Sequence, residues 1–401
     1  MTNDIFISYS WNNKDIADKI FSDLSLIGLS ILKDRHNINY TDSISDFMTQ
    51  IRDSKYAILI ISDSYLKSTN CMLEVLQLLK DDKIIWDKIL PIVVDAEYFN
   101  IIDRMNYIRF WQEREKDIAE TIKDIDPINV LSTLEELKNI KNISQNIDYF
   151  LTNLKDCLAL SPTEFFRDNY KTLLDHIDIK PNTKKLIQLI PIDSIQNPHK
   201  KLKAISDFID KGNFENSACY NILADSYKDL GQKDLAVKNY KKAIELNELN
   251  FSAWNNLGQV YELLYHNFDE AKKAYEKSIV SNPTSEIARL NLAILYKNHL
   301  QNIQKAIELN ESILQFDENN ASAHSNLASI YRLTDKEKFK KHVIIAVNQE
   351  HFNAIMMYAN YLKLEEKNFD LGNQYYIKAK KLDKKGVYKD LIDLLIRSDK
   401  G

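Results

Sequence analysis

The order of apolar and polar residues divides the chain into two textures. Residues 1–111 alternate short β-rich apolar runs with amphipathic helical stretches, whereas residues from about 200 onward are almost purely helical. Tyr56–Ile61 (YAILII) is continuously apolar, which is typical of a strand buried on both faces of a sheet. The pattern therefore predicts an α/β domain followed by an all-α region.

The first part contains five predicted strands, at Asp4–Tyr9, Ser30–Lys33, Tyr56–Ile61, Ile89–Val94 and Tyr107–Phe110. Helical patterns lie between them at Lys14–Leu26, Ile44–Arg52 and Cys71–Asp81. Strands that alternate with helices form a parallel sheet with helices on both faces. We therefore expect a flavodoxin-like α/β fold with a parallel five-stranded sheet, which binds its ligand at the carboxyl ends of the strands.

The helical part repeats a leucine, a small residue and a tyrosine three residues later. The pattern occurs at Leu223–Tyr227, Leu257–Tyr261, Leu292–Tyr296 and Leu327–Tyr331, with tyrosines 34, 35 and 35 residues apart. Second helices carry the small residues Ala236, Ala271 and Ala306, and Tyr240 and Tyr275 follow the first two of these. With Trp254 and Pro283, the pattern resembles the tetratricopeptide family and implies an all-α solenoid.

The ends of the solenoid and the segment before it are predicted from weaker patterns. A degenerate fifth unit is expected at 358–379, followed by a capping helix at Val387–Arg397. Helices are also expected at Ile140–Leu160 and Thr163–Ile177, with Pro162 and Pro181 as stops. Lys200–Lys211 is predicted as an extra helix that covers the N-terminal repeat.

The α/β part resembles the TIR family. The resemblance rests on Asp4–Ser10 (DIFISYS), on Ile44–Ser62, on the spacing Tyr65-x2-Ser68-x2-Cys71-x2-Glu74, and on Tyr107–Trp111 (YIRFW). The family often has tryptophan before the cysteine, whereas this chain has Asn70, which affects a packing expectation more than a catalytic one. The resemblance implies a TIR domain at 1–178 (core 3–111, helical extension 112–178), a helical linker or N-terminal cover at 179–216, and repeats at 217–401.

Enzymatic TIR domains cleave the bond between nicotinamide and ribose in NAD+, and the resemblance nominates Glu74 as the catalytic residue. Loss of nicotinamide leaves positive charge on the ribose, and a carboxylate stabilises that charge. Nicotinamide is already cationic in NAD+, so no general acid is needed. The implied activity is that of an NAD+ nucleosidase (NADase), a hydrolase, with ADP-ribosyl cyclase activity and a cyclic ADP-ribose product as an alternative outcome. NAD+ is the substrate, and no cofactor is implied.

The other candidate residues are expected to bind substrate: Ser8, Tyr9, Ser10, Trp11, Asp34, Arg35, Ser62, Tyr65 and Cys71. Structural roles compete with each assignment. Glu74 is expected in the first turn of a helix, where the helix dipole favours an acid. Hydroxyl groups such as that of Ser62 cap helices, and Cys71 fits a small residue at a helix start. Trp11 either stacks on the nucleotide or covers the core. The resemblance places Asp34 and Arg35 in a loop that commonly contacts a neighbouring TIR domain, and the alternative is that they pair with each other on the surface.

Composition and the absence of several motifs argue against other classes of function. The net charge is −5, so the basic surface typical of nucleic-acid or anionic-membrane binding is missing. The sequence contains no GxGxxG, GxxxxGK[ST] or HExxH motif, and its histidines are too scattered to predict a metal site. Three separated cysteines, no signal-peptide pattern and no run of about 18 apolar residues lead us to expect a cytoplasmic protein.

Three functions remain open. The first is an NADase that self-associates through its TIR domain, is regulated by a protein or small molecule on the repeats, and acts in prokaryotic anti-phage defence. The second is a non-catalytic scaffold that mediates protein–protein interaction, which burial of Glu74 would favour. The third is a generator or receptor of a nucleotide signal.

Overall fold

The structure is a computed structural model, and it describes residues 5–33, 53–79, 86–123, 125, 130–157, 159–177, 181–212, 216–283, 285–315 and 317–397. The chain divides into two compact units between Gly212 and Asn213. None of the helices formed by these residues is long and apolar enough to cross a membrane.

The first unit is built on a parallel sheet. Its strands are β1 (Ile5–Tyr9), β2 (Ile31–Lys33), β3 (Tyr56–Ile61) and β4 (Ile89–Val93), in the order β2-β1-β3-β4. In the register, Ile5 lies opposite both Ile31 and Tyr56, and Ala57 lies opposite Ile89. Every residue of β1 and the last five residues of β3 are buried, so both faces of the central strands are covered.

The predicted fifth strand is wrong. Tyr107–Phe110 lies inside α5 (Ile101–Thr121), and the described residues contain four strands rather than five. The side chain of Asn100 caps this helix by accepting a hydrogen bond from the backbone of Asp103. Tyr107 and Trp111, four residues apart, are both buried, which is the spacing of one helix face rather than of a strand.

Helices follow the strands as the sequence predicts, with some differences at their ends. The helix predicted at Lys14–Leu26 is confirmed as α1, and a 3₁₀ turn at Trp11–Asn13 precedes it. A short helix, α3 (Asp63–Leu66), precedes α4 (Thr69–Leu78), which begins two residues before the predicted Cys71. The predicted helix Ile44–Arg52 lies outside the described residues.

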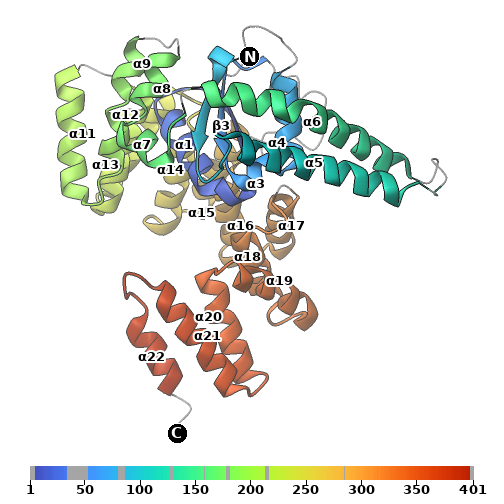
Figure 1. Cartoon of the computed structure of the whole chain (residues 1–401). Helices are drawn as coiled ribbons and strands as arrows, with labels where there is room; N and C mark the ends of the chain where they lie inside the picture. Colours follow the sequence, from blue (N-terminus) through green and yellow to red (C-terminus); the bar gives the residue numbers. More distant parts are fainter. Residues whose placement is uncertain are drawn as a thin grey trace. The chain divides into compact units, whose positions relative to one another are not determined.

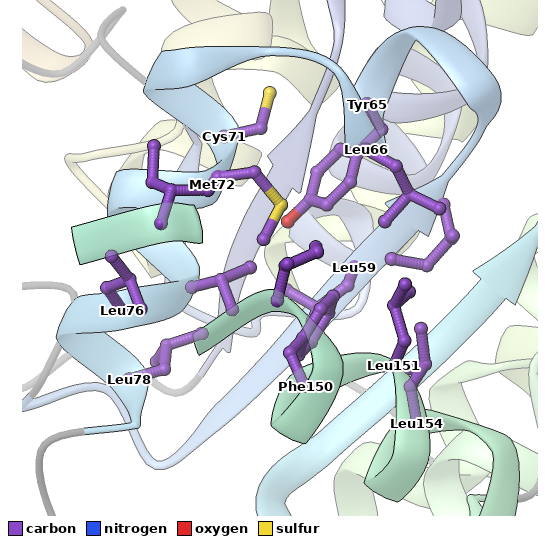
Figure 2. Packing of buried hydrophobic residues seen from close by; sticks show 14 of the residues in the cluster. Leu59, Tyr65, Leu66, Cys71, Met72, Leu76, Leu78, Phe150, Leu151 and Leu154 are labelled. Carbon is purple, nitrogen blue, oxygen red and sulfur yellow. The ribbon is translucent and has the colours of Figure 1, made fainter. Parts of the chain in front are cut away.

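A long helix, α6 (Leu131–Asp156), runs beside α5 and completes the core of the first unit (Figure 1). Figure 2 shows Phe150, Leu151 and Leu154 of α6 packed among side chains of β3 and α4, such as Leu59 and Met72. This cluster includes Met72, Val75 and Leu76 of α4, so it supports the helix that carries Glu74.

Further helices follow in the first unit: the short α7 (Pro162–Arg167), α8 (Lys171–His176), α9 (Pro181–Leu186) and α10 (Leu189–Asp193), and the longer α11 (Pro198–Gly212). No helix runs through Pro162 or Pro181, as their prediction as stops requires, and each proline also begins the next helix, where its missing N–H is not needed. The single helix predicted at Thr163–Ile177 is divided, because Asn169 and Tyr170 have φ values of 50° and 62°.

The described residues of the second unit form five helix pairs and a final helix. The pairs are α12 (Ser217–Asp229) with α13 (Lys233–Leu246), α14 (Phe251–Leu263) with α15 (Phe268–Ser281), α16 (Glu286–Asn298) with α17 (Ile303–Leu314), α18 (Ala321–Tyr331) with α19 (Lys336–Asn348), and α20 (Phe352–Leu364) with α21 (Phe369–Leu382). The predicted capping helix is α22 (Lys389–Arg397), which packs on α21 (Figure 1).

The repeat residues pack as their spacing predicts. Ala236, Ala271 and Ala306 are fully buried in the second helices. Tyr240 and Tyr275 are also fully buried, and each hydroxyl donates a hydrogen bond to a carboxylate on the preceding helix. A buried tyrosine needs such a partner, so these positions combine apolar packing with one fixed polar contact.

Candidate functional site

The candidate site lies at the carboxyl ends of β1 and β3. These strands are neighbours in the sheet. From β1 the chain forms β2 on one side of it, and then crosses to the other side of β1 to form β3 and β4. Ligands of open α/β sheets bind at such a switch point. Ser8 and Tyr9 end β1, and Ser62 directly follows β3, so the sheet brings these predicted residues to one edge.

Glu74 is hydrogen-bonded at this edge. The Ser8 hydroxyl donates to Oε2 of Glu74 at 2.6 Å, and the Tyr65 hydroxyl lies 2.8 Å from Ser8 Oγ. Ser8 and Tyr65 have no exposed surface, and Glu74 is 2% exposed. Three residues that were predicted separately therefore form one buried network, but in this arrangement the carboxyl group is not open to a nucleotide.

The position of Glu74 in its helix corrects the competing structural explanation. Ser68 is the N-cap of α4, and its side chain accepts a hydrogen bond from the backbone of Cys71. The first turn of α4 contains no acidic residue, so Glu74 lies in the second turn. The effect of the helix dipole falls off within the first turn, so it does not account for an acid at this position.

A second polar cluster adjoins this network. Ser62 and Ser10 both donate to Oδ1 of Asn13, at 2.7 and 2.9 Å, and Ser64 Oγ lies 2.7 Å from Ser10 Oγ. Ser62 also caps α3 by accepting a hydrogen bond from the backbone of Tyr65 at 3.1 Å. The sequence interpretation missed Asn13 and Ser64, although each follows a strand end by only a few residues.

The remaining candidates have different environments. Cys71 is buried, and its thiol lies 3.4 Å from the carbonyl oxygen of buried Tyr9, consistent with a small residue that packs at the start of a helix. Trp11 is 51% exposed, with the Lys14 ammonium 5.5 Å from its ring centre, so it does not cover the core. Asp34 and Arg35 lie outside the described residues.

Helix α5 holds α3 beside the site. The Trp111 indole donates to the carbonyl oxygen of Leu66 at 3.0 Å, and the Tyr107 hydroxyl donates to Oδ1 of Asp63 at 3.2 Å. Burial and the neighbouring Asp63 carboxylate raise the pKa of Tyr107, so the phenol remains a donor at neutral pH. Within the described ranges, no group of three or more His, Cys, Asp or Glu side chains is arranged to hold a metal ion.

The comparisons with known proteins agree with this architecture. The TIR domain model matches residues 5–123, the TPR repeat model matches 224–264 and the tetratricopeptide repeat model matches 251–285. No curated protein is similar enough to match the chain.

Similar solved structures are tetratricopeptide repeat and pilus proteins. A tetratricopeptide repeat protein from Parabacteroides merdae is 17% identical, with 71% of this chain and 98% of that chain covered and a TM-score of 0.42. PilW, a type IV pilus biogenesis factor, is 16% identical, with 50% and 91% covered and a TM-score of 0.41. YrrB, a TPR protein with an unusual peptide-binding site, is 17% identical, with 45% and 93% covered and a TM-score of 0.34.

The family models, the parallel sheet and the paired helices lead to one description. The chain carries a TIR domain, matched at residues 5–123, followed by tetratricopeptide repeats, matched at residues 224–285.

Proposed function

We propose that the TIR domain cleaves NAD+ between nicotinamide and ribose, with Glu74 as the catalytic carboxylate. The observation that carries this proposal is the hydrogen bond from Ser8 to Glu74 at the ligand edge of the sheet. A carboxyl group at a buried position costs several kcal/mol in desolvation, on the order of a domain's whole stability. Its neighbour Val75 is equally buried and apolar, so packing alone does not call for an acid.

The proposed chemistry needs only one carboxylate. The bond between the ribose carbon and the pyridinium nitrogen breaks, and its electron pair neutralises the departing nicotinamide. Glu74 stabilises the cationic ribose, and water then adds to it and releases a proton, giving ADP-ribose. If a nitrogen of the adenine attacks instead, a cyclic product forms. Such a carboxylate contributes about 3–4 kcal/mol, or a few hundredfold in rate.

The burial of Glu74 sets a condition on this function, because its carboxyl group must be uncovered to contact a ribose. We propose that association of TIR domains, together with binding of a partner to the repeats, uncovers it. Trp11 is exposed and is proposed to stack on nicotinamide or adenine. The proposed biological setting is NAD+ depletion in the cytoplasm of prokaryotes during anti-phage defence.

The test is nicotinamide release from NAD+ by the full chain at high protein concentration, with and without a crowding agent. Glu74→Gln is expected to lower the rate a few hundredfold. Glu113→Gln, which changes an exposed acid on α5, is the matched control and should retain the wild-type rate. If the wild type releases no nicotinamide under any assembly condition, the enzymatic function is refuted. If Glu74→Gln is as fast as the wild type, only the assignment of Glu74 fails.

The burial of Glu74 favours a second candidate, a non-catalytic scaffold. TIR domains associate with one another and tetratricopeptide repeats bind proteins, so both parts can serve assembly without chemistry. A scaffold predicts that Glu74→Gln leaves self-association unchanged and that nicotinamide is absent from every reaction. Chromatography of the products separates ADP-ribose from a cyclic signal, which distinguishes hydrolysis from the synthesis of a messenger.

A further inference from the structure

The hydrogen bonds around Glu74 have a fixed direction. A serine hydroxyl carries one proton, and Ser8 donates that proton to Oε2 of Glu74. The 2.8 Å contact between Ser8 Oγ and the Tyr65 hydroxyl must then be donated by Tyr65. The order of donation is therefore Tyr65 to Ser8 to Glu74, and successive hydrogen bonds of this kind strengthen one another.

Burial separates these two hydroxyl groups from solvent. Ser8 and Tyr65 have no exposed surface, and Figure 2 shows the Tyr65 ring among the apolar side chains of the core. Glu74 is buried as well, but the proposed uncovering need reach only its carboxyl group, because Ser8 and Tyr65 precede it in the order of donation. This environment does not suit the substrate-binding role predicted for Ser8 and Tyr65 from the sequence.

Helix α3, which carries Tyr65, is held in place by three hydrogen bonds. The Tyr65 backbone N–H donates to Ser62 Oγ at 3.1 Å, which fixes the start of α3 to the end of β3. The Trp111 indole donates to the next residue, Leu66, and Tyr107 donates to Asp63. These contacts place the donor end of the relay on rigid elements, which is what an oriented catalytic group requires.

We infer that Tyr65 and Ser8 form a hydrogen-bond relay that positions the Glu74 carboxylate for reaction, and that neither residue contacts NAD+. This inference rests on the proposed function of Glu74. The relay occupies Oε2 and fixes the rotation of the carboxyl group. Both residues are positioning residues, so their removal acts on the chemical step rather than on substrate binding.

The first test does not depend on activity. The full chain is labelled with glutamate carrying ¹³C in its carboxyl group, and the Glu74 resonance is assigned by its loss in Glu74→Gln. Ser8→Ala and Tyr65→Phe are expected to shift that resonance. Tyr98→Phe is the matched control, because Tyr98 is equally buried in the same core and its hydroxyl has no partner within the described part of the chain. A Glu74 resonance that Tyr65→Phe leaves unmoved overturns the relay.

The second test is kinetic and uses nicotinamide release. Ser8→Ala should lower kcat roughly ten- to hundredfold, and Tyr65→Phe roughly three- to tenfold, with KM nearly unchanged. A hydrogen bond donated to a carboxylate favours its charged form, so the acid limb of the pH profile of kcat should move to higher pH in both variants. Tyr98→Phe should leave kcat, KM and the pH profile as in the wild type.

The outcomes separate this inference from the proposed function. If the wild type is active and Tyr65→Phe changes KM but neither kcat nor the pH profile, the positioning role is wrong while the enzymatic function stands. If the wild type is inactive, the enzymatic function fails and with it the catalytic purpose of the relay, while the carboxyl resonance still decides whether the relay exists. Circular dichroism confirms that each variant is folded before these comparisons are made.

Discussion

Gly258 tests whether the small-residue positions of the repeats exist to let helices approach. A Cβ atom built on Gly258 in α14 would lie 2.6 Å from Cε1 and 2.7 Å from Cδ1 of Tyr275 in α15. The Tyr275 ring is fully buried, and its hydroxyl donates to Glu262 Oε2 at 2.7 Å. The ring therefore has no free direction in which to move, and Gly258→Ala must push the two helices apart.

The expected change in the free energy of unfolding of Gly258→Ala is the sum of opposing contributions. Alanine in a helix interior is favoured over glycine by about 1 kcal/mol. Carbon atoms pack at about 3.5–4.0 Å, so the helices must separate by about 1 Å, and overpacking of this kind costs about 1–3 kcal/mol. Disturbing the hydrogen bond from Tyr275 to Glu262 costs about 1 kcal/mol more. We expect Gly258→Ala to destabilise the repeats by about 1–3 kcal/mol.

The assay is urea unfolding of the full chain, followed by circular dichroism at a helical wavelength and compared with the wild type. Tyr275→Leu removes the ring, so Gly258→Ala should cost less in that background than in the wild type. The equivalent positions in other repeats hold Ala224 and Ala293, both buried, so a methyl group is accepted where the spacing allows it. If Gly258→Ala is as stable as the wild type or more stable, helix propensity outweighs close approach and the reasoning is refuted.

Three further substitutions test single polar groups by unfolding experiments. Tyr98→Phe should stabilise the first unit by about 1 kcal/mol, because the buried Tyr98 hydroxyl has no partner among the described residues. Burial also raises the pKa of Tyr98 to about 12. A loss of stability in this variant would contradict the prediction. Tyr240→Phe should destabilise the repeats by about 1.5–3 kcal/mol, because it removes a hydrogen bond donated to the Asp225 carboxylate; an unchanged midpoint would contradict this. Burial, with nearby His324 and lysine charges, lowers the pKa of His342 from 6.5 to about 4, so the unfolded chain binds a proton that the folded chain excludes between these pH values. Stability should fall by about 1–2 kcal/mol as the pH decreases from 7 to 4, a value reduced for the partial exposure of the ring, and His342→Gln should remove this part of the pH dependence.

The sequence predicts regular elements well where one periodicity dominates. The Lys14–Leu26 helix and the paired helices of the repeats have the predicted periodicity, and the structure confirms them. Tyr107–Phe110 is too short to separate strand from helix by its pattern, and its apolar residues resemble those of a strand. The cap at Asn100 and the hydrogen bond from Trp111 to α3 both favour a helix. The hydrogen bond to α3 depends on the tertiary fold, so the local sequence does not reveal it.

The candidate site was predictable in its location but not in its accessibility. Ser8 lies near the end of β1, Ser62 directly follows β3, and Glu74 lies on a helix that follows β3, so a parallel sheet brings them to one edge. Burial of Glu74 depends on the packing of α4 against β1 and on the contact of Ser8 with Tyr65 of α3, and no local pattern encodes these contacts. Asn13 and Ser64 follow the ends of β1 and β3 by four and three residues, so their place at this edge is encoded by local spacing.

Burial and the relay act on different steps of the proposed reaction. A carboxylate held in a site that excludes water acts more strongly on a developing cation than one in bulk solvent, and this contribution appears in kcat. Uncovering Glu74 costs free energy before the reaction begins. Each 1.4 kcal/mol of this cost weakens the apparent binding of NAD+ tenfold, so the cost appears in KM. Association of TIR domains that favours the uncovered state should therefore lower KM while leaving kcat unchanged, whereas Ser8→Ala should lower kcat while leaving KM unchanged. A scaffold has neither dependence, so the separation of these two constants distinguishes a closed enzyme from a protein in which Glu74 is only a structural residue.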